Sequence, residues 1–226
     1  MEEVIVLLLA CLSLLTIFCL YKMLDKRGLY FALVILNIIG FVLAFKISNA
    51  FKMNINTSII PIISSLTVIY IFIIKYGTKE INNLLKISLY SNIIVALLLA
   101  IMNFFVPAIT ETVSINMQGT FEYNYKILIT YPIIMLISIL AISKLYELVY
   151  SIQNNIPLCI SLTHIISSLI YTVIFSILSY INIIEIKYSL FLGISTYIIG
   201  LPILIINIIF INYLTKNKKV KSWQVI

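Results

Sequence analysis

The chain has 226 residues, of which 62% are hydrophobic and only 10% are charged, and its formal net charge is +7. Soluble globular domains have about 25% charged residues, so this composition excludes a soluble enzyme or binding module and predicts an integral membrane protein. Each crossing of a hydrocarbon layer about 30 Å thick takes about 20 helical residues. The length therefore predicts one polytopic transmembrane domain that covers residues 1–226.

Apolar stretches that are long enough to cross a membrane as helices recur along the chain, and polar residues bound each of them. In chain order the seven stretches cover about 4–20, 28–47, 58–75, 87–107, 127–150, 156–182 and 189–214. None has the alternating pattern of a membrane β-barrel strand. We therefore predict an all-α integral membrane protein, a bundle of about seven transmembrane helices.

The first stretch resembles a secretion signal only in its hydrophobicity. Glu2 and Glu3 stand where a signal peptide has basic residues, and no small-residue cleavage site follows, so we expect this helix to be retained. The chain has three cysteines, Cys11, Cys19 and Cys159, all within predicted helices. An odd number of such thiols favours packing residues over a disulfide framework or a metal cluster.

The distribution of basic residues predicts the orientation of the bundle. With the amino terminus outside, eleven of the fifteen Lys and Arg residues face the cytoplasm, namely Lys22, Lys26, Arg27, Lys75, Lys79, Lys86, Lys144, Lys216, Lys218, Lys219 and Lys221. The opposite side keeps Lys46, Lys52, Lys126 and Lys187. Basic loops remain cytoplasmic, so we predict N-terminus out and C-terminus in. The charge then reflects topology beside anionic headgroups of the lipid bilayer, and we expect no nucleic-acid partner.

Motifs that carry catalysis are missing from the sequence. It has no H-E-x-x-H, no G-x-S-x-G, no P-loop and no paired aspartates within a predicted helix, and its single histidine has no carboxylate near it in sequence. We therefore expect that the protein is not an enzyme and that it uses no cofactor and no metal.

Polar side chains inside the predicted helices are the remaining sign of function, because each is costly in a membrane and tends to face the bundle interior or a cavity. Asn92 and Asn103 are eleven residues apart, which is close to three helical turns. Other polar positions recur at helical spacing: His164 with Ser168, Thr172 and Ser176; Ser64 with Thr67; Gly193 with Gly200 and Asn207. Such rows line a midplane pocket in some proteins and serve ordinary helix packing in others, and the sequence leaves both readings open.

The residue types in these rows suggest one kind of ligand. Amides, hydroxyls and one imidazole offer neutral donors and acceptors, and Tyr70 and Tyr171 offer rings, which suits a flat, uncharged heterocycle. The candidate substrate-binding residues are Asn92, Asn103, His164, Ser167, Ser168, Tyr70, Thr67 and Asn207.

Lys144 and Glu147 differ from these residues because they are ionisable. They lie one turn apart near the inner end of the fifth predicted helix, where a pair at i and i+3 can form. One interpretation is an ion pair at the interface, with the Lys side chain reaching toward the headgroups. The other is a gate or a substrate acceptor at the cytoplasmic mouth, and it predicts that loss of the Glu147 charge reduces folding or transport.

The order of several segments resembles the queuosine precursor transporter family, also called the vitamin uptake transporter family. The segments are "GLYFALVILNIIGFVLAFK" with a Phe five residues after Lys46, "YGTKEINNLLKISLYSNIIVALLL", "ILAISKLYELVYSI", "SLTHIISSLIYTVIF" and "TYIIGLPILIINIIF". The likeness covers about 28–210, and its most specific part looks like the family's Tyr-Gly-Lys-Lys-Glu-Ala turn. It implies a bacterial plasma-membrane protein with a six-helix core plus an amino-terminal helix, which takes up a 7-deazaguanine base or queuine.

The chain departs from the family at most of its intramembrane charges. Tyr70 and Ile74 stand where the family has acids before the Tyr-Gly turn, and the pattern Ser-Gln-x-x-Asp becomes Ser143, Lys144 and Glu147. A Gln and an Asp of the next helix become His164 and Ser167, and a Lys and an Asp of the last become Gly200 and Asn207. Because buried polar groups matched to the ligand give specificity, this loss points to a changed substrate or to lost transport.

Three functions follow as hypotheses. The first is a transporter of the family's type for a small planar heterocycle. The second is the substrate-binding subunit of an energy-coupling-factor vitamin importer, whose docking stripe of small residues has only Ala10 and Ser13 as counterparts in the first stretch. The third is a membrane partner protein that no longer transports. The sequence does not indicate an oligomeric state.

Overall fold

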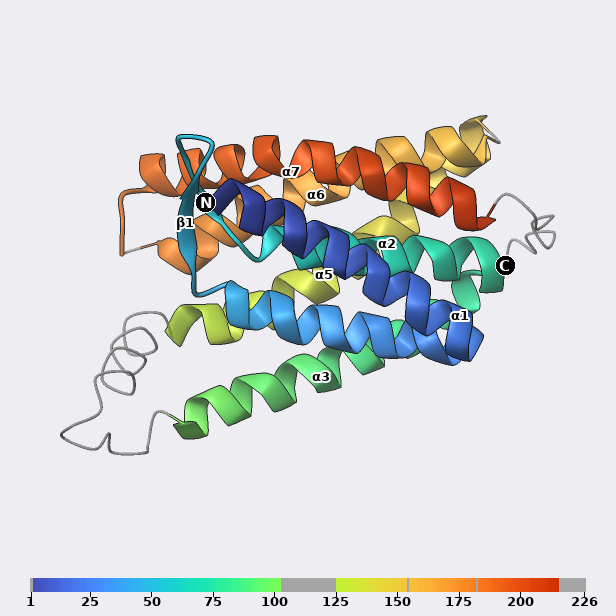
Figure 1. Cartoon of the computed structure of the whole chain (residues 1–226), viewed down its shortest axis with the longest axis horizontal. Coiled ribbons are helices and arrows are strands. Elements are labelled where there is room, and N and C mark those ends of the chain that lie inside the picture. Colours follow the sequence, from blue (N-terminus) through green and yellow to red (C-terminus); the bar gives the residue numbers. More distant parts are fainter. Residues whose placement is uncertain (1, 103–124, 154, 182, 216–226) are drawn as a thin grey trace.

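The computed structural model describes residues 2–102, 125–153, 155–181 and 183–215. Figure 1 shows a bundle of long helices with a short β-hairpin at one end. In chain order the elements are α1 (Glu2–Leu43), β1 (Ile47–Ala50), β2 (Met53–Asn56), α2 (Ile59–Tyr76), the 3₁₀ turn η1 (Thr78–Glu80), α3 (Ile81–Met102), α5 (Tyr125–Gln153), α6 (Ile156–Tyr180) and α7 (Ile186–Thr215).

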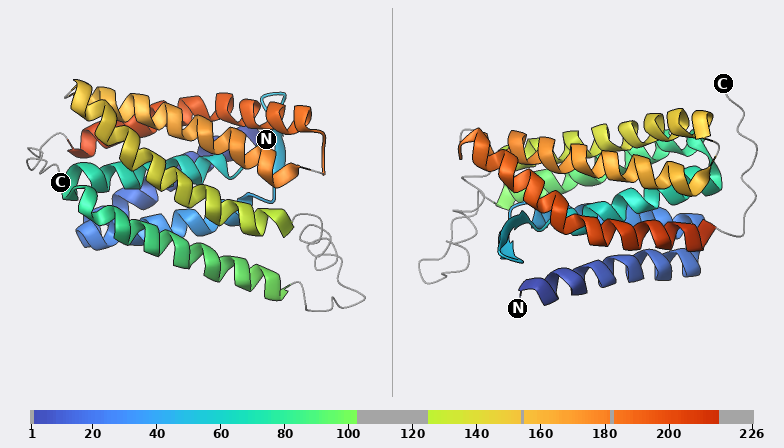
Figure 2. Two further views of the ribbon diagram at one scale, coloured as in Figure 1. Left: turned by 180° about the vertical axis from the view of Figure 1, so that it is seen from behind. Right: turned by 90° about the horizontal axis from the view of Figure 1, so that it is seen from above.

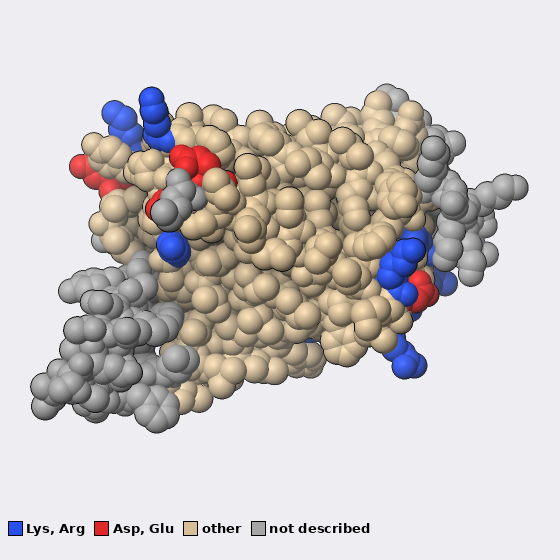
Figure 3. All heavy atoms as spheres, viewed as in Figure 1, with Lys and Arg blue, Asp and Glu red and all other residues tan. Residues whose placement is uncertain are grey.

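Among the described residues, six helices are long and apolar enough to cross a membrane. On the face drawn in Figure 3, the charged side chains gather at the two ends of the bundle, and other residues cover the surface between them. A bilayer core requires such a belt, because a charge there is costly and backbone groups must be satisfied within helices. The fold is thus a multi-pass all-α membrane bundle, as the composition predicts.

Helix α1 holds two arms that meet at Asp25, whose φ of 48° and ψ of −123° break the helix. Figures 1 and 2 show that the arms run in opposite directions. Glu3 lies at one end, where its carboxylate accepts a hydrogen bond from Phe51 N, and Tyr21 lies at the other beside Lys75. The predicted stretches 4–20 and 28–47 are these two arms.

The bend of α1 depends on a glycine. A Cβ atom at Gly28 would lie 1.8 Å from the carbonyl oxygen of Leu20, so the two arms approach each other more closely than any side chain permits. Glycine is the residue that allows such an approach. The polar segment 21–27 separates the two predicted stretches and so marks the bend in the sequence, and Gly28 allows the close return of the second arm.

The second arm ends earlier than predicted, at Leu43 rather than near residue 47, and the antiparallel hairpin β1–β2 follows it. The prediction of an all-α fold omits this hairpin. Its turn is formed by Phe51 and Lys52, both with positive φ (53° and 62°). Hairpin turns of this kind normally carry Asn or Gly, so Phe-Lys gives no turn signal and the hairpin could not be read from the sequence.

Helix α2 is the centre of the bundle, since every residue from Ile59 to Ile74 is buried. The second arm of α1 and helices α6 and α7 surround it (Figure 2). Its predicted stretch, 58–75, matches the observed helix. Polar side chains of α2 consequently face other helices on every side and not lipid, which makes this helix the natural position for a buried site.

The remaining helices begin within about six residues of the predicted stretches, and α5, α6 and α7 also end within a few residues of them. The predicted end of the fourth stretch, near 107, lies outside the described residues. Pro132 and Pro202 lie inside α5 and α7, and Pro157 lies in the first turn of α6, where its missing N–H is no loss. The predicted cytoplasmic loop after α2 is the short turn η1. We call the end of the bundle near β1 and β2 the hairpin end, and the end near Asp25 and η1 the basic end.

Candidate functional site

A polar cluster lies where α2, α6 and α7 meet. The hydroxyl of Thr67 donates a hydrogen bond to Asn207 Oδ1 at 2.8 Å, and its oxygen is 3.4 Å from His164 Nε2. Asn207 in turn donates to the carbonyl oxygen of Ile203, one turn earlier in α7. All three polar side chains are fully buried, so three helices are joined in the interior by neutral hydrogen bonds.

Tyr70, one turn after Thr67 on α2, extends this cluster toward the basic end. Its ring centroid lies 5.0 Å from that of His164, and its hydroxyl oxygen is 3.4 Å from Ser167 Oγ. We call Thr67, Tyr70, His164, Ser167 and Asn207 the Thr67 cluster. These five residues were predicted as candidates from three separate stretches of sequence, and the structure brings them together.

The Thr67 cluster includes a buried nitrogen atom that could form a further hydrogen bond. His164 Nδ1 is buried and has no hydrogen-bond partner among the described residues. Ser168, the next candidate on α6, donates back to the carbonyl oxygen of His164 at 2.8 Å. The cluster holds no carboxylate and no ammonium group, so it offers neutral donors, neutral acceptors and an aromatic face to a ligand.

Asn92 lies in a different place from the other candidates. Its side-chain amide and that of Asn37 both donate to Ser88 Oγ, at 3.4 and 3.0 Å, and all three residues are buried. Tyr131 of α5 donates to the carbonyl oxygen of Asn37. We call Asn37, Ser88, Asn92 and Tyr131 the Asn37 cluster, which joins α1, α3 and α5. Asn103 lies outside the described residues.

Neither Asn37 nor Ser88 was selected as a candidate from the sequence, and the two cases differ. Ser88 is four residues before Asn92, so the spacing rule that selected Asn92 also places Ser88 on the same face. Asn37 is a single amide within an apolar run, and its partner becomes evident only when α1 packs on α3.

Tyr171, the second predicted ring, also lies apart from the Thr67 cluster. It stacks on Phe175 one turn later in α6, with ring centroids 5.5 Å apart and nearly parallel planes. Phe175 meets Tyr131 edge to face. The Tyr171 ring is thus part of an aromatic layer in the core.

Lys144 and Glu147 form the expected pair at i and i+3, with 3.7 Å between Nζ and Oε2. Their side chains are 81% and 41% exposed. This exposure corresponds to an ion pair on the surface of the bundle rather than to a buried charge, and such pairs contribute about 0–1 kcal/mol. A large folding cost from loss of the Glu147 charge is therefore no longer expected.

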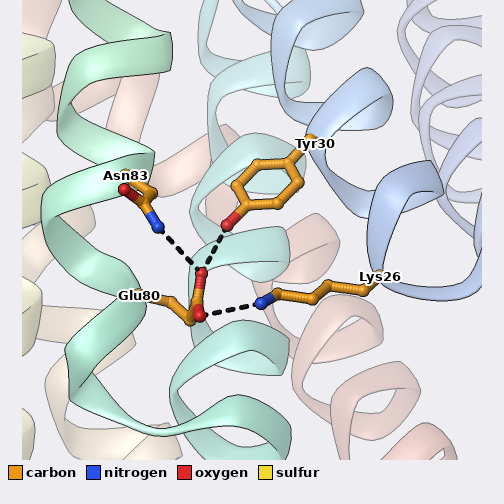
Figure 4. A network of polar contacts seen from close by, with 4 residues as sticks. All are labelled: Lys26, Tyr30, Glu80 and Asn83. Atoms are coloured by element: carbon orange, nitrogen blue, oxygen red, sulfur yellow. Dashed lines mark hydrogen bonds and ion pairs between the residues drawn. The ribbon is translucent and has the colours of Figure 1, made fainter.

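Glu80, in the turn η1, is an acid with three hydrogen-bond donors around it. It accepts from Lys26 Nζ at 2.7 Å, from the Tyr30 hydroxyl at 2.5 Å and from Asn83 Nδ2 at 3.2 Å (Figure 4). The network ties the second arm of α1 to the start of α3. The sequence placed Glu80 in a loop and in the family-like turn but did not indicate this network, because Lys26 and Tyr30 are about 50 residues away.

A second residue that the sequence did not single out is Asn56, the last residue of β2. Its amide donates to the carbonyl oxygen of Ala44 at 2.8 Å and to the Tyr180 hydroxyl at 2.9 Å, and its Oδ1 accepts from the backbone and the hydroxyl of Ser58. Its backbone N–H donates to Thr196 Oγ1. An Asn side chain has two donors and two acceptor positions, so the Asn56 side chain uses its full capacity on Ala44 after α1, on Tyr180 of α6 and on Ser58 before α2, and its backbone adds α7.

One cavity opens at the hairpin end, between the first arm of α1 and the start of α2. Its volume is about 100 Å³, and its lining consists of Glu2, Ile5, Val6, Leu9, Leu43, Lys46, Ser48, Thr57 and Ile60. None of the predicted site residues lines it. The Thr67 cluster is therefore separate from this cavity.

These features define the class of the protein as a multi-pass all-α membrane bundle with neutral polar clusters in its interior. In the part of the chain that the structure describes, no three His, Cys, Asp or Glu residues are grouped to hold a metal ion. Comparison with protein families, with curated proteins and with solved structures found no match.

Proposed function

We propose that the protein is a membrane transporter that imports a small, planar, uncharged heterocycle, with a queuosine precursor or queuine as the first substrate to test. The observation that carries the proposal is the Thr67 cluster. Three helices contribute neutral donors, neutral acceptors and the Tyr70 ring at one buried place, and His164 Nδ1 has no partner there among the residues that the structure describes. Sites of this composition suit flat ligands with hydrogen-bonding edges.

The resemblance to the queuosine precursor transporter family adds a second line of support. Tyr70, His164, Ser167 and Asn207 stand at positions where that family carries polar or charged residues. These four positions, far apart in the sequence, all belong to the Thr67 cluster. If the binding site lies at the same positions as in the family but has neutral side chains in place of charged ones, we expect transport to be retained and the ligand preference to change.

We further propose seven membrane crossings in a bacterial plasma membrane, with the N-terminus out and the C-terminus in. The two antiparallel arms of α1 supply two crossings, since the shorter arm, 26–43, spans about 27 Å at 1.5 Å per residue. Lys46, Lys52, Lys126 and Lys187 lie in elements of the hairpin end, and more basic residues surround η1 at the other end. That asymmetry favours the basic end as cytoplasmic.

The importer-subunit hypothesis receives less support. Ala10 and Ser13, the small residues of the first arm that would form a docking stripe, are 6% and 4% exposed and lie on the buried face of α1. They are turned into the bundle and are not presented to a coupling subunit. The hypothesis of a partner protein without transport is tested by the uptake experiment itself.

The test is uptake in a bacterium that makes no queuosine precursor and lacks its own carrier. We expect the protein to restore queuosine in tRNA when the cyano-substituted precursor is supplied at low concentration, and to do so less well with the cationic aminomethyl precursor. The reason is that burying an amine without a carboxylate partner is costly. The readout is the queuosine content of tRNA.

A matched pair of variants connects uptake to the Thr67 cluster. Thr67→Val keeps the shape of the side chain and removes the donor to Asn207, whereas Thr172→Val removes an equally buried hydroxyl that bonds only to the backbone of α6. We expect uptake to fall about tenfold in the first variant, as for one lost buried hydrogen bond, and to stay near the parent level in the second. Folded protein that restores no modification with either precursor or queuine would contradict the substrate, and equal uptake by both variants would contradict the site.

A further inference from the structure

Buried serine hydroxyl groups without partners occur between the Thr67 cluster and the hairpin end. They belong to the three helices of the cluster, and each is at most 1% exposed: Ser64 of α2, Ser176 and Ser179 of α6, and Ser189 of α7. None has a hydrogen-bond partner among the described residues. We call these four residues the serine row.

The serine row differs from the other hydroxyls of the same helices. Thr163, Ser168 and Thr172 each donate to a backbone carbonyl three or four residues earlier in α6. This is the usual way for Ser and Thr to satisfy themselves inside a membrane helix. Ser176 and Ser179 do not, so their hydroxyls are free for a group that is not part of the helix. Buried polar groups are normally satisfied by protein or by ordered water.

Along their helices, the members of the serine row lie between the Thr67 cluster and the hairpin end. Ser64 is one turn nearer the hairpin end than Thr67, and Ser179 lies about 22 Å along α6 from His164 at 1.5 Å per residue. Ser176 lies at the contact of α6 with α7, because a Cβ atom at Gly193 would be 3.3 Å from its Cβ. The row therefore leads from the Thr67 cluster to the end of α6.

The β-hairpin lies at that end. Asn56 holds it to Tyr180, the last residue of α6, and to Thr196 of α7. Ser195 of α7 also donates to the carbonyl oxygen of Asn54 in β2. Figure 1 shows the hairpin beside α7, at the end of the bundle opposite the bend of α1. All of these attachments are hydrogen bonds to side chains, which can exchange with water when the hairpin moves.

We propose that solute reaches the Thr67 cluster along the serine row from the hairpin end, and that the β-hairpin, held by Asn56, is the cover of this route. The inference rests on the proposed function for the identity of the solute, a neutral hydrogen-bonding heterocycle. Each Ser hydroxyl can donate to and accept from such a molecule or from water. The route itself has consequences that need no substrate.

The test measures the accessibility of single cysteines in a background in which Cys11, Cys19 and Cys159 are replaced. Ser64→Cys and Ser179→Cys report on the row, and Ser88→Cys reports on the equally buried Asn37 cluster. The purified full chain is treated with a small, charged methanethiosulfonate, and the labelling rate is measured by mass spectrometry. We expect both row positions to react faster than Ser88→Cys.

The cover is tested by weakening its attachments without removing bulk. Tyr180→Phe with Thr196→Val deletes two partners of Asn56 and keeps the shape of both side chains. We expect this double variant to raise the labelling rate of the row about tenfold, as for the loss of one or two hydrogen bonds that hold a closed state. Tyr131→Phe, which removes a buried hydroxyl outside the hairpin, is the matched control and should leave the rate unchanged.

The outcomes separate the route from the substrate. Row positions that react no faster than Ser88→Cys in every background would overturn the route. Rates that are high in the parent and unaffected by the double variant would overturn the role of the hairpin as a cover. Labelling as expected, together with failure to restore queuosine, would leave the route in place and overturn only the substrate proposed above.

Discussion

Glu80 and Glu147 have identical side chains, but their surroundings lead us to expect different contributions to stability. Both carry a negative charge next to a lysine. The Glu80 side chain is 19% exposed and has three hydrogen-bond donors from two helices, whereas that of Glu147 is 41% exposed and has one lysine at 3.7 Å. Hydrogen bonds to charged groups gain strength as water is excluded, so the two acids should differ in their effect on stability.

The first prediction compares Glu80→Gln with Glu147→Gln. We expect the Glu80 change to lower the free energy of unfolding by about 1–3 kcal/mol, because it leaves Lys26 without its anion and weakens the bond from Tyr30. The Glu147 change should cost no more than about 1 kcal/mol. Unfolding of the purified protein in a detergent titration measures both. Equal losses would mean that the network of Figure 4 adds nothing beyond a surface pair.

At the scale of elements, the bend of α1 decides how the chain enters the bundle. The two arms are long apolar helices that would continue as one rod if nothing broke them. Asp25 breaks the helix, and Gly28 then lets the second arm return against Leu20. The second prediction concerns this glycine.

Gly28→Ala should destabilise the protein by about 1–3 kcal/mol, the range for overpacking a tight contact, because the added methyl group meets a backbone oxygen that cannot turn away. Val42→Ala on the same arm removes exposed bulk and serves as the control, since Val42 is 50% exposed. The midpoint of detergent unfolding and the yield of monodisperse protein are the measurements. A Gly28→Ala protein as stable as the control would contradict the close approach of the arms.

The β-hairpin has little signal in the sequence. In the proposed route it is the element that covers access to the site. Its strands are four residues each, and its turn uses Phe51 and Lys52 where other hairpins use Asn and Gly. Hydrogen bonds from Asn56 to other elements stabilise the hairpin, which the local sequence does not favour. Ala50 and Ile55 add buried apolar contacts to these bonds, so each strand has one side chain in the core.

For the whole molecule, the orientation in the membrane is the property with the widest consequences, since it decides which end meets the outside. The third prediction places the hairpin end outside. Single cysteines at Lys52 and Lys187 should react with an impermeant thiol reagent in intact cells, and those at Thr78 and Asn82 should react only after the cells are opened. The reverse pattern would invert the bundle and make the hairpin a cytoplasmic cover.

The sequence by itself determined the class of the protein and the extent of most helices. An apolar run of about 20 residues must form a helix in a bilayer because no other single segment satisfies its backbone there. The predicted stretches therefore match the observed helices to within a few residues. Helical spacing also selected Thr67 and His164 as candidate site residues, whereas Tyr70 was selected for its ring and Ser167 through the family resemblance.

Only the tertiary structure decided which polar residues meet. Spacing along a helix shows which side chains share a face, but not which helix that face contacts. The packing of α2 against α6 and α7 joined Thr67 to Asn207, and the packing of α1 on α3 gave Asn92 a different partner. The partners that join Asn56 and Glu80 to other helices, Tyr180 for the first and Lys26 and Tyr30 for the second, lie far along the chain, where neither periodicity nor local preference extends.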